Sequence, residues 1–420
     1  MEESNINDGG QPKKQELPTD GKQAWTVGIG SFLISLLCGL PNCWGIMQDH
    51  YKRSSTFASD TDVNIKLTFV GALFQAMVLS CVFFINLIYS RVGFRPVLYT
   101  GLILTTAGLM LASLATSIWQ LYLSVSVCTG LGIACFSTVG LRILPQWFVK
   151  YRATAFGVQA STFAIFALIV PHIMVAINNA LGAPWTYRVL GFISFALILS
   201  SVVLIRERVQ SPPVSVKKQF VSLVPILKDL NMMIWVVVGP IQMYASYTVF
   251  VFIPSYATFI GLTETQGAAT ISVLSAAGIV GRIAAGICGD KLGHLNTYIM
   301  CMFICIISIF AIWMFANNFG VLLLFAVVNG LVYGSYFTLA APVVINILGS
   351  MEKYPAAVSI SMLAFIFFVL GPLIASVVEA NNTQHPFLYC KIIAGVGYAA
   401  CALLSLFLKF RLKRNFLANI

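Results

Sequence analysis

Twelve continuous apolar runs, each about as long as one bilayer-spanning helix, constrain this chain more than any other feature. They lie at 25–47, 66–88, 96–116, 119–143, 154–177, 188–206, 232–254, 266–288, 296–316, 319–346, 356–378 and 387–408. A spanning helix needs about 20 apolar residues, whereas the strands of a transmembrane barrel alternate apolar and polar residues. Because 59% of the residues are hydrophobic and only 9% are charged, the pattern predicts an all-α membrane protein and excludes a soluble globular domain.

Two short segments about 200 residues apart repeat one pattern. Each ends an apolar run with a basic residue, a spacer and a glycine, and another apolar run follows. The first copy has Asn86 and Ser90 where the second has Gly286 and Asp290. We interpret both as conformational-gating loops, with motif residues Arg91, Gly93, Arg95, Gly286, Asp290, Lys291 and Gly293. The repeat predicts two pseudo-symmetric six-helix bundles, an arrangement typical of secondary transporters.

A polar segment between the sixth and seventh runs divides the chain. It contains Ser211-Pro212-Pro213 and the basic pair Lys217-Lys218. We therefore predict a disordered cytosolic tail, an N-terminal bundle, a cytosolic linker, a C-terminal bundle and a cytosolic tail at 1–23, 24–206, 207–231, 232–408 and 409–420.

The net charge of +11 reflects orientation in the membrane and not nucleic-acid binding. With both termini inside, 18 of the 25 Lys and Arg residues fall on the cytosolic side and five on the outer side. This asymmetry follows the positive-inside rule and suits the anionic inner leaflet. We expect an integral, multi-pass protein of the plasma membrane, with the vacuolar or endoplasmic reticulum membrane as alternatives. The outer Asn381-Asn382-Thr383 sequon is a candidate glycosylation site.

Two sequence signatures flank the first and fifth runs. Asp20 and Gly21 precede Trp25, and Trp147-Phe148 precede Lys150 and Arg152. Together with the second gating loop, Gly286 to Gly293, these residues resemble the major facilitator superfamily, and within it the fungal branch of the monocarboxylate transporter family. The resemblance covers all twelve runs. It implies alternating access by two rocking bundles, a small-molecule solute and no cofactor.

The chain departs from animal members of that family at two positions. Their proton-linked chemistry uses a Lys after the Pro of the first helix and an Asp four residues before the Arg of the eighth. Here these positions hold Asn42 and Gly278, and only Arg282 remains. We therefore expect facilitated diffusion or exchange with weak or no proton coupling. The alternative is a proton-linked monocarboxylate symporter in which His172, the one histidine within a run, relays the proton.

Arg282 is the main candidate for solute binding. It lies about 12 Å from the inner interface, eight residues before Asp290 at 1.5 Å per residue, and all 14 acidic residues fall in tails, loops or run ends. A guanidinium binds a carboxylate bidentately, so we predict a small organic anion. A packing role against helix carbonyls is the alternative. Polar and aromatic side chains predicted to line the same cavity are Asn42, Gln159, Gln242, Tyr244, Tyr247, Tyr333 and Tyr336.

Other readings follow from the remaining polar residues. Arg142 lies close enough to the inner interface to reach the lipid headgroups. A non-transporting nutrient sensor on the same fold is an alternative function, although such a sensor usually carries a long signalling extension. No Ser/His/Asp set, paired carboxylates or Walker loop is present in the sequence, so an enzyme is rejected. We expect no metal and no nucleic-acid partner; the sequence does not address an accessory subunit.

Overall fold

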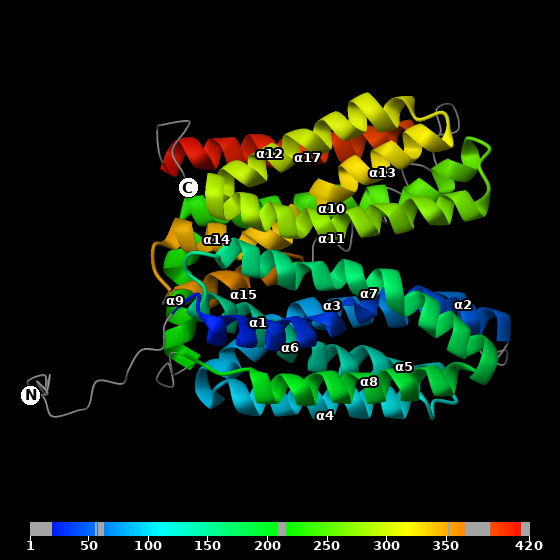
Figure 1. The fold of residues 1–420 in the computed structure, drawn as a ribbon. Coiled ribbons are helices and arrows are strands. Elements are labelled where there is room, and N and C mark those ends of the chain that lie inside the picture. The colour runs from blue at the N-terminus through cyan, green and yellow to red at the C-terminus, as the bar shows by residue number, and fades with distance from the viewer. Residues whose placement is uncertain are drawn as a thin grey trace, which may run out of the picture.

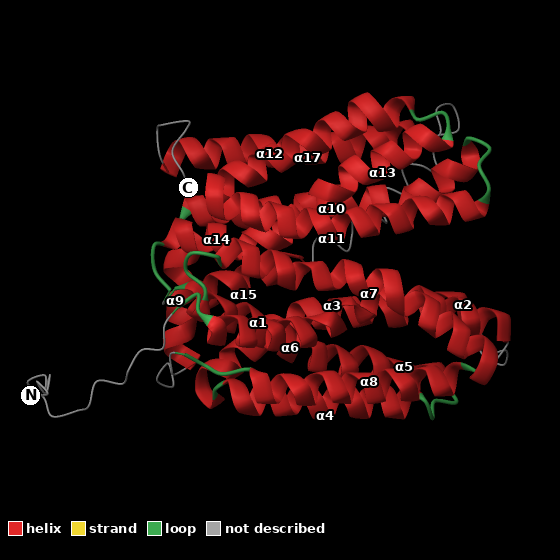
Figure 2. Cartoon of the chain, viewed as in Figure 1, coloured by secondary structure: helices red, strands yellow, loops and turns green. Residues whose placement is uncertain are grey.

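The computed structural model describes residues 19–54, 57, 63–208, 216–351, 353–365 and 387–412. Within this part of the chain the regular structure is helical (Figure 2). The helices of the first half are α1 Lys22–Leu36, η1 Leu37–Cys43, α2 Trp44–Ser54, α3 Val63–Val92, α4 Phe94–Ala112, α5 Ile118–Leu121, η2 Tyr122–Thr129, α6 Gly130–Trp147, α7 Arg152–Leu181 and α8 Ala183–Leu204. Those that follow are α9 Val216–Lys228, α10 Leu230–Phe259, α11 Glu264–Leu292, α12 His294–Ile307, η3 Ser308–Ile312, η4 Trp313–Phe315, α13 Phe319–Tyr333, α14 Ser335–Leu348, α15 Tyr354–Ala364 and α17 Leu388–Leu412.

Eleven helical segments are long and apolar enough to cross a membrane. They match eleven of the twelve predicted runs. Helix α15 is the described part of the remaining run, 356–378, and the rest of that run lies outside the described residues. The sequon at Asn381 also lies outside them.

The spans form two bundles with a shared long axis (Figure 1). Helices α1–α8 build the N-terminal bundle and α10–α17 the C-terminal bundle, as predicted. We call the end at which α3 is followed by α4 and α11 by α12 the motif end; it is the left end in Figure 1. Helix α7 packs against α11 and α14, and α3 packs against α15. These three contacts join the bundles.

The described residues of the predicted linker include helix α9. Helix α9 runs across the spans at the motif end (Figure 1) and packs against α10 and α15. The last span extends to Leu412, four residues beyond the predicted run. There Arg411 donates a hydrogen bond from its Nε to Asn231 Oδ1 of α10, 2.9 Å away, so the basic end of the helix is held against its neighbour.

Four spans within the described residues change helix type or break along their length, and the first and tenth bear on the candidate site. The first changes to the tighter helix η1 around Pro41, which lacks the N–H that would continue the α-helical pattern. The tenth is divided into α13 and α14 at Gly334. Interrupted helices are typical of transporter sites, because they expose backbone polar groups inside the membrane.

Candidate functional site

Arg282 is buried inside the C-terminal bundle and only 5% of it is exposed. Its Nη2 donates a hydrogen bond to the Tyr333 hydroxyl, 3.2 Å away, and its guanidinium carbon lies 5.1 Å from the centre of the Tyr333 ring. Neither Nε nor Nη1 has a hydrogen-bond partner within the described residues. A buried cation without a counter-ion is costly, so this guanidinium is poised for a further acceptor.

The break between α13 and α14 makes room for this arginine. A Cβ at Gly334 would collide with Arg282 Nε, and a Cβ at Gly281 would collide with the Leu331 carbonyl oxygen. Both glycines therefore allow close approach of the broken span to α11. The Arg282 carbonyl accepts a hydrogen bond from Thr338 Oγ1 at 3.4 Å, so α14 contacts the backbone of this residue while Tyr333, at the end of α13, contacts its side chain.

Tyr333 and Gln242 continue the polar contacts of Arg282 across the C-terminal bundle. Gln242, which is fully buried, donates from Nε2 to the Tyr333 carbonyl at 2.8 Å and accepts at Oε1 from the Tyr298 hydroxyl at 2.5 Å. Both ends of the Gln242 amide are therefore hydrogen-bonded within the C-terminal bundle. Tyr336 packs among Trp235, Tyr298 and Phe365.

The other predicted lining residues lie apart from this group. Gln159 of α7 donates to the hydroxyls of Ser31 and Ser35, 3.1 and 2.8 Å away within the N-terminal bundle. Asn42 is exposed in η1. Tyr244 is partly buried and Tyr247 is exposed on α10. Their part in solute binding stays a prediction.

His172 is exposed on α7, one residue after Pro171 in the same helix. Arg282 Nη2 is paired with Tyr333 and not with this histidine. Among the described residues, no hydrogen bond links the predicted proton relay to the guanidinium.

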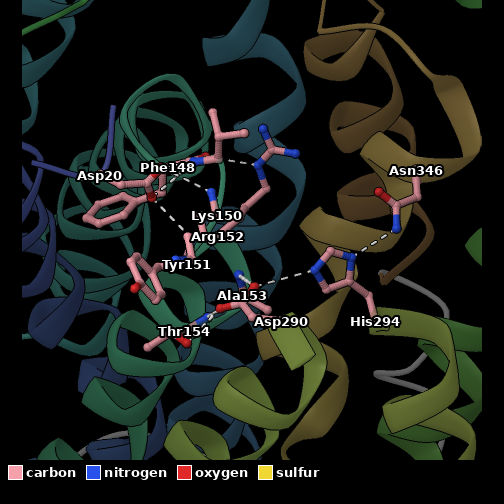
Figure 3. A network of polar contacts seen from close by, with 11 residues as sticks. Asp20, Phe148, Lys150, Tyr151, Arg152, Ala153, Thr154, Asp290, His294 and Asn346 are labelled. Carbon is pink, nitrogen blue, oxygen red and sulfur yellow. Dashed lines mark hydrogen bonds and ion pairs between the residues drawn. The ribbon is translucent and has the colours of Figure 1, made fainter. Parts of the chain in front are cut away.

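The second gating loop joins the two bundles directly. The carboxylate of Asp290, at the end of α11, accepts hydrogen bonds from the backbone N–H groups of Ala153 and Thr154 at 2.9 and 2.8 Å and from Thr154 Oγ1 at 2.7 Å (Figure 3). These groups form the first turn of α7, where backbone N–H groups have no helical partner and the helix dipole favours an anion. Asp290 also lies 3.5 Å from His294 Nε2, whose Nδ1 contacts Asn346.

The family signatures meet just before the same helix. Asp20 accepts hydrogen bonds from the backbone N–H groups of Val149, Lys150 and Tyr151 at 3.1 to 3.3 Å (Figure 3). Trp25 packs edge-on against Phe148 with ring centres 5.0 Å apart. Two carboxylates, one from each bundle, therefore fix consecutive stretches of the segment that begins α7.

Three further signature residues hold this segment from the N-terminal bundle. Trp147 donates from Nε1 to the Arg206 carbonyl at 2.8 Å, and Arg152 donates from Nε to the Phe148 carbonyl at 3.1 Å. The Lys150 ammonium lies 5.2 Å from the Tyr151 ring centre. Gly21 is the N-cap of α1. The signature residues thus make structural contacts around the start of α7.

The first gating loop makes the corresponding contact without a carboxylate. Asn86 donates from Nδ2 to the Pro355 carbonyl at 2.6 Å and to the Ser359 hydroxyl of α15. Its Oδ1 accepts from Arg142 Nη1 at 3.1 Å, which also donates to Ser90 Oγ at 2.8 Å. Our prediction that Arg142 reaches the lipid headgroups is wrong, because its guanidinium is bound inside the bundle.

Glu207 supplies an acidic group beside this loop. It follows α8 and accepts a hydrogen bond from the Tyr89 hydroxyl at 3.2 Å, while the Arg142 guanidinium lies 4.2 Å from the Tyr89 ring centre. Burial raises the pKa of Glu207 above its ordinary value, although the hydrogen bond from Tyr89 and the charge of Arg142 act in the opposite direction. Sequence analysis did not single out this residue, since it lies in the linker.

The structure requires glycine at different positions of the two loops for different reasons. Gly93 and Gly293 adopt φ angles of 79° and 93°, a conformation that residues with a side chain rarely adopt. Gly286 faces the N-terminal bundle, where an added Cβ would lie 2.5 Å from the Ala153 carbonyl oxygen. The basic motif residues Arg91, Arg95 and Lys291 are exposed. The repeat is therefore a pair of tight turns beside inter-bundle contacts.

Two bundles joined at paired loops and a span broken inside the membrane are typical of secondary transporters. The family model of the Major Facilitator Superfamily matches residues 27–318. The chain belongs to this superfamily, and its function is membrane transport of a small molecule.

Fungal transporters resemble the chain over most of its length. An MFS-type transporter 1 of Ophiocordyceps sp. (strain BCC 1869) is 27% identical, over 79% of this chain and 73% of the relative. The fujikurins efflux protein of Gibberella fujikuroi is 24% identical, over 90% and 81%. The riboflavin transporter MCH5 of Saccharomyces cerevisiae is 24% identical, over 93% and 79%.

A solved structure shares the fold. The crystal structure of FucP, a Major Facilitator Superfamily transporter, in the outward conformation aligns with a TM-score of 0.67 at 13% identity, over 92% of this chain and 98% of that one. At this identity the match speaks for the fold and not for the solute.

Proposed function

We propose that this transporter carries a small organic anion and that Arg282 holds its anionic group. The observation behind the proposal is the guanidinium itself, buried, hydrogen-bonded to Tyr333 and unpaired at Nε and Nη1 within the described residues. A carboxylate on the solute would neutralise this charge and accept its remaining N–H groups bidentately. Because the guanidinium is enclosed while the bundles touch at the motif end, the anion reaches it when the bundles rock apart.

The aromatic neighbours favour a solute with a planar or ring part. Tyr333 lies against the guanidinium and 6.3 Å from the Phe250 ring, so a flat group bound at Arg282 would meet aromatic surface. Aromatic faces stack on rings and attract cations. The riboflavin transporter among the relatives moves a ring compound, which agrees with this part of the proposal. Membership in the monocarboxylate transporter family is proposed on other residues, the signatures Asp20, Gly21, Trp25, Trp147, Phe148, Lys150 and Arg152.

Proton coupling is weak or absent in this proposal. A symporter needs a group that takes up and releases a proton during the cycle. The two positions that would supply it hold Asn42 and Gly278, and His172 is exposed on α7, whereas the described hydrogen-bond partner of the Arg282 guanidinium is Tyr333. These residues favour facilitated diffusion or exchange. The membrane we propose for the protein is the plasma membrane.

The test is a comparison of acids with their uncharged analogues. Metabolite profiles of cells with and without the gene name candidate solutes. Purified protein in proteoliposomes is then given each candidate carboxylate and its carboxamide at equal concentration. We expect the carboxylate to be taken up and the amide to be rejected by at least tenfold. Equal transport of the two forms, or a purely cationic solute, would contradict the proposal.

A further inference from the structure

Helix α9 presents apolar side chains on two sides. Leu223 and Ile226 are 8% and 1% exposed and belong to the main apolar core, which fixes one face of the helix on α10 and α15. Val221, Val224 and Leu227, spaced three residues apart, are 62%, 48% and 50% exposed. Residues three apart lie along one side of a helix. The outer side of α9 is thus an apolar stripe of its own.

The charge of α9 is entirely positive. Its sequence, Val216 to Lys228, contains three lysines and no acidic residue. The last of these lysines, Lys228 at the end of α9, is exposed. An apolar stripe combined with basic residues is the pattern of helices that lie in the interface of an anionic membrane.

The position of α9 agrees with a place at the bilayer surface. The helix runs across the spans at their motif ends and not along them (Figure 1). The spans on either side of it, α8 and α10, carry exposed apolar residues close to the linker, Val203 and Leu230 at 71% and 51% exposure. The surface that these spans show to lipid therefore extends to the two ends of the linker.

We propose that α9 is an interfacial helix that inserts Val221, Val224 and Leu227 among the headgroups of the leaflet at the motif end and binds its anionic phospholipids. The occupant is lipid, since the stripe lies next to lipid-facing spans and the helix carries three positive charges and no negative one. This inference is independent of the solute and stands whether or not Arg282 binds an anion.

The contact also connects lipid to the transport cycle. Helix α9 packs against α15, and α15 receives the hydrogen bonds of Asn86 from the other bundle. A lipid surface that holds α9 in place therefore holds the helix that closes the first loop contact.

The test measures what surrounds the stripe in the full-length protein. In a Cys288→Ser background, since Cys288 is exposed, a nitroxide is attached at Val224→Cys or Leu227→Cys, and at Lys228→Cys as the polar control on the same helix. The protein is placed in vesicles of phosphatidylcholine with one-fifth phosphatidylserine. Collision rates with oxygen, which concentrates in lipid, and with a water-soluble nickel chelate are compared.

We expect the labels at 224 and 227 to collide more with oxygen than with the nickel chelate, and the label at 228 to show the reverse. A stripe open to the nickel chelate would be solvated and would overturn the proposal. Low collision rates with both reagents would show that a protein segment or a second copy covers the stripe, and would also overturn it.

The anionic part is tested separately. Omitting phosphatidylserine should lower the oxygen preference at position 224 at least twofold. Replacing all three lysines of α9 by Gln should remove that difference while size-exclusion behaviour stays unchanged. The same oxygen preference with and without phosphatidylserine would contradict the binding of anionic lipid.

Discussion

Asp290 of the C-terminal bundle caps the N-terminus of α7 in the N-terminal bundle, where Thr154 lies in the first turn of the helix. The carboxylate accepts two backbone N–H groups and the Thr154 hydroxyl at 2.7 to 2.9 Å, and its side chain is 9% exposed. A charged capping bond of this kind exists only while the bundles touch. The contact therefore stabilises one conformation of the cycle relative to the others.

Asp290→Asn should open the motif end. Hydrogen bonds to charged groups contribute about 1.5–3 kcal/mol each, so losing the charge should lower the closed-to-open ratio about tenfold or more. The measurement is maleimide labelling of Ala153→Cys, which is buried between the bundles, in a Cys288→Ser background. Asp229→Asn is the matched control, because Asp229 caps α10 within one bundle. Equal labelling of both variants would contradict the gating role.

Gly157→Ala should keep α7 and α11 apart. An added Cβ would lie 2.5 Å from the Arg282 carbonyl oxygen, too close for the helices to retain their spacing. We expect loss of transport and faster labelling at position 153. Gly267→Ala on α11 is the control, because its Cβ would meet the nearest atom at 3.4 Å. Normal transport by the Gly157 variant would show that the contact is dispensable.

Glu207→Gln should change how stability depends on pH. Burial raises the pKa of Glu207, so the protonated carboxyl favours the folded protein, and that contribution is lost as the pH rises through the raised value. Gln has no such loss. The melting temperature of the variant should therefore gain on that of the wild type as the pH rises above about 4.5, the ordinary value for Glu. A difference that stays constant, or shrinks, would contradict the effect of burial.

The fold was largely predictable because its spans are continuous apolar runs and its two loops repeat. The eleven spans found within the described residues and the pairing of the two halves follow from these two patterns. The structure adds what patterns cannot show. In the sequence, Asn86 stood out only because the second copy has Gly at the same place, yet its amide joins the bundles. The available signal for this contact was that Asn, unlike Gly, has a side chain that forms hydrogen bonds.

The charge of the candidate site could be predicted from the sequence, whereas its contacts could not. Arg282 stood out as a cation inside a span. Gln242 has the same residue type whether it faces a solute or a neighbouring helix, and only the structure shows both ends of its amide bonded within the bundle. Arg142 was assigned to the headgroups by depth alone, and the side chains of α3 that bind it come from 52 to 56 residues away.

Transport should not depend on a proton gradient. Vesicles supplied with external solute and an inward proton gradient should bring the solute to equal concentrations on both sides and not concentrate it, because the two positions that would supply the coupling charges hold Asn42 and Gly278. Accumulation above the external concentration that an uncoupler abolishes would contradict this and would make His172 the next residue to replace.

The central claim is that the buried guanidinium of Arg282 binds the anion, and transport by Arg282 variants tests it most directly. Uptake of the identified carboxylate is measured for the wild type, Arg282→Ala and Arg282→Lys at matched amounts of folded protein in proteoliposomes. We predict that Ala reduces uptake at least a hundredfold and that Lys restores little, since an ammonium lacks the planar donor geometry. Wild-type uptake by Arg282→Ala would contradict the account and leave Arg282 with a packing role.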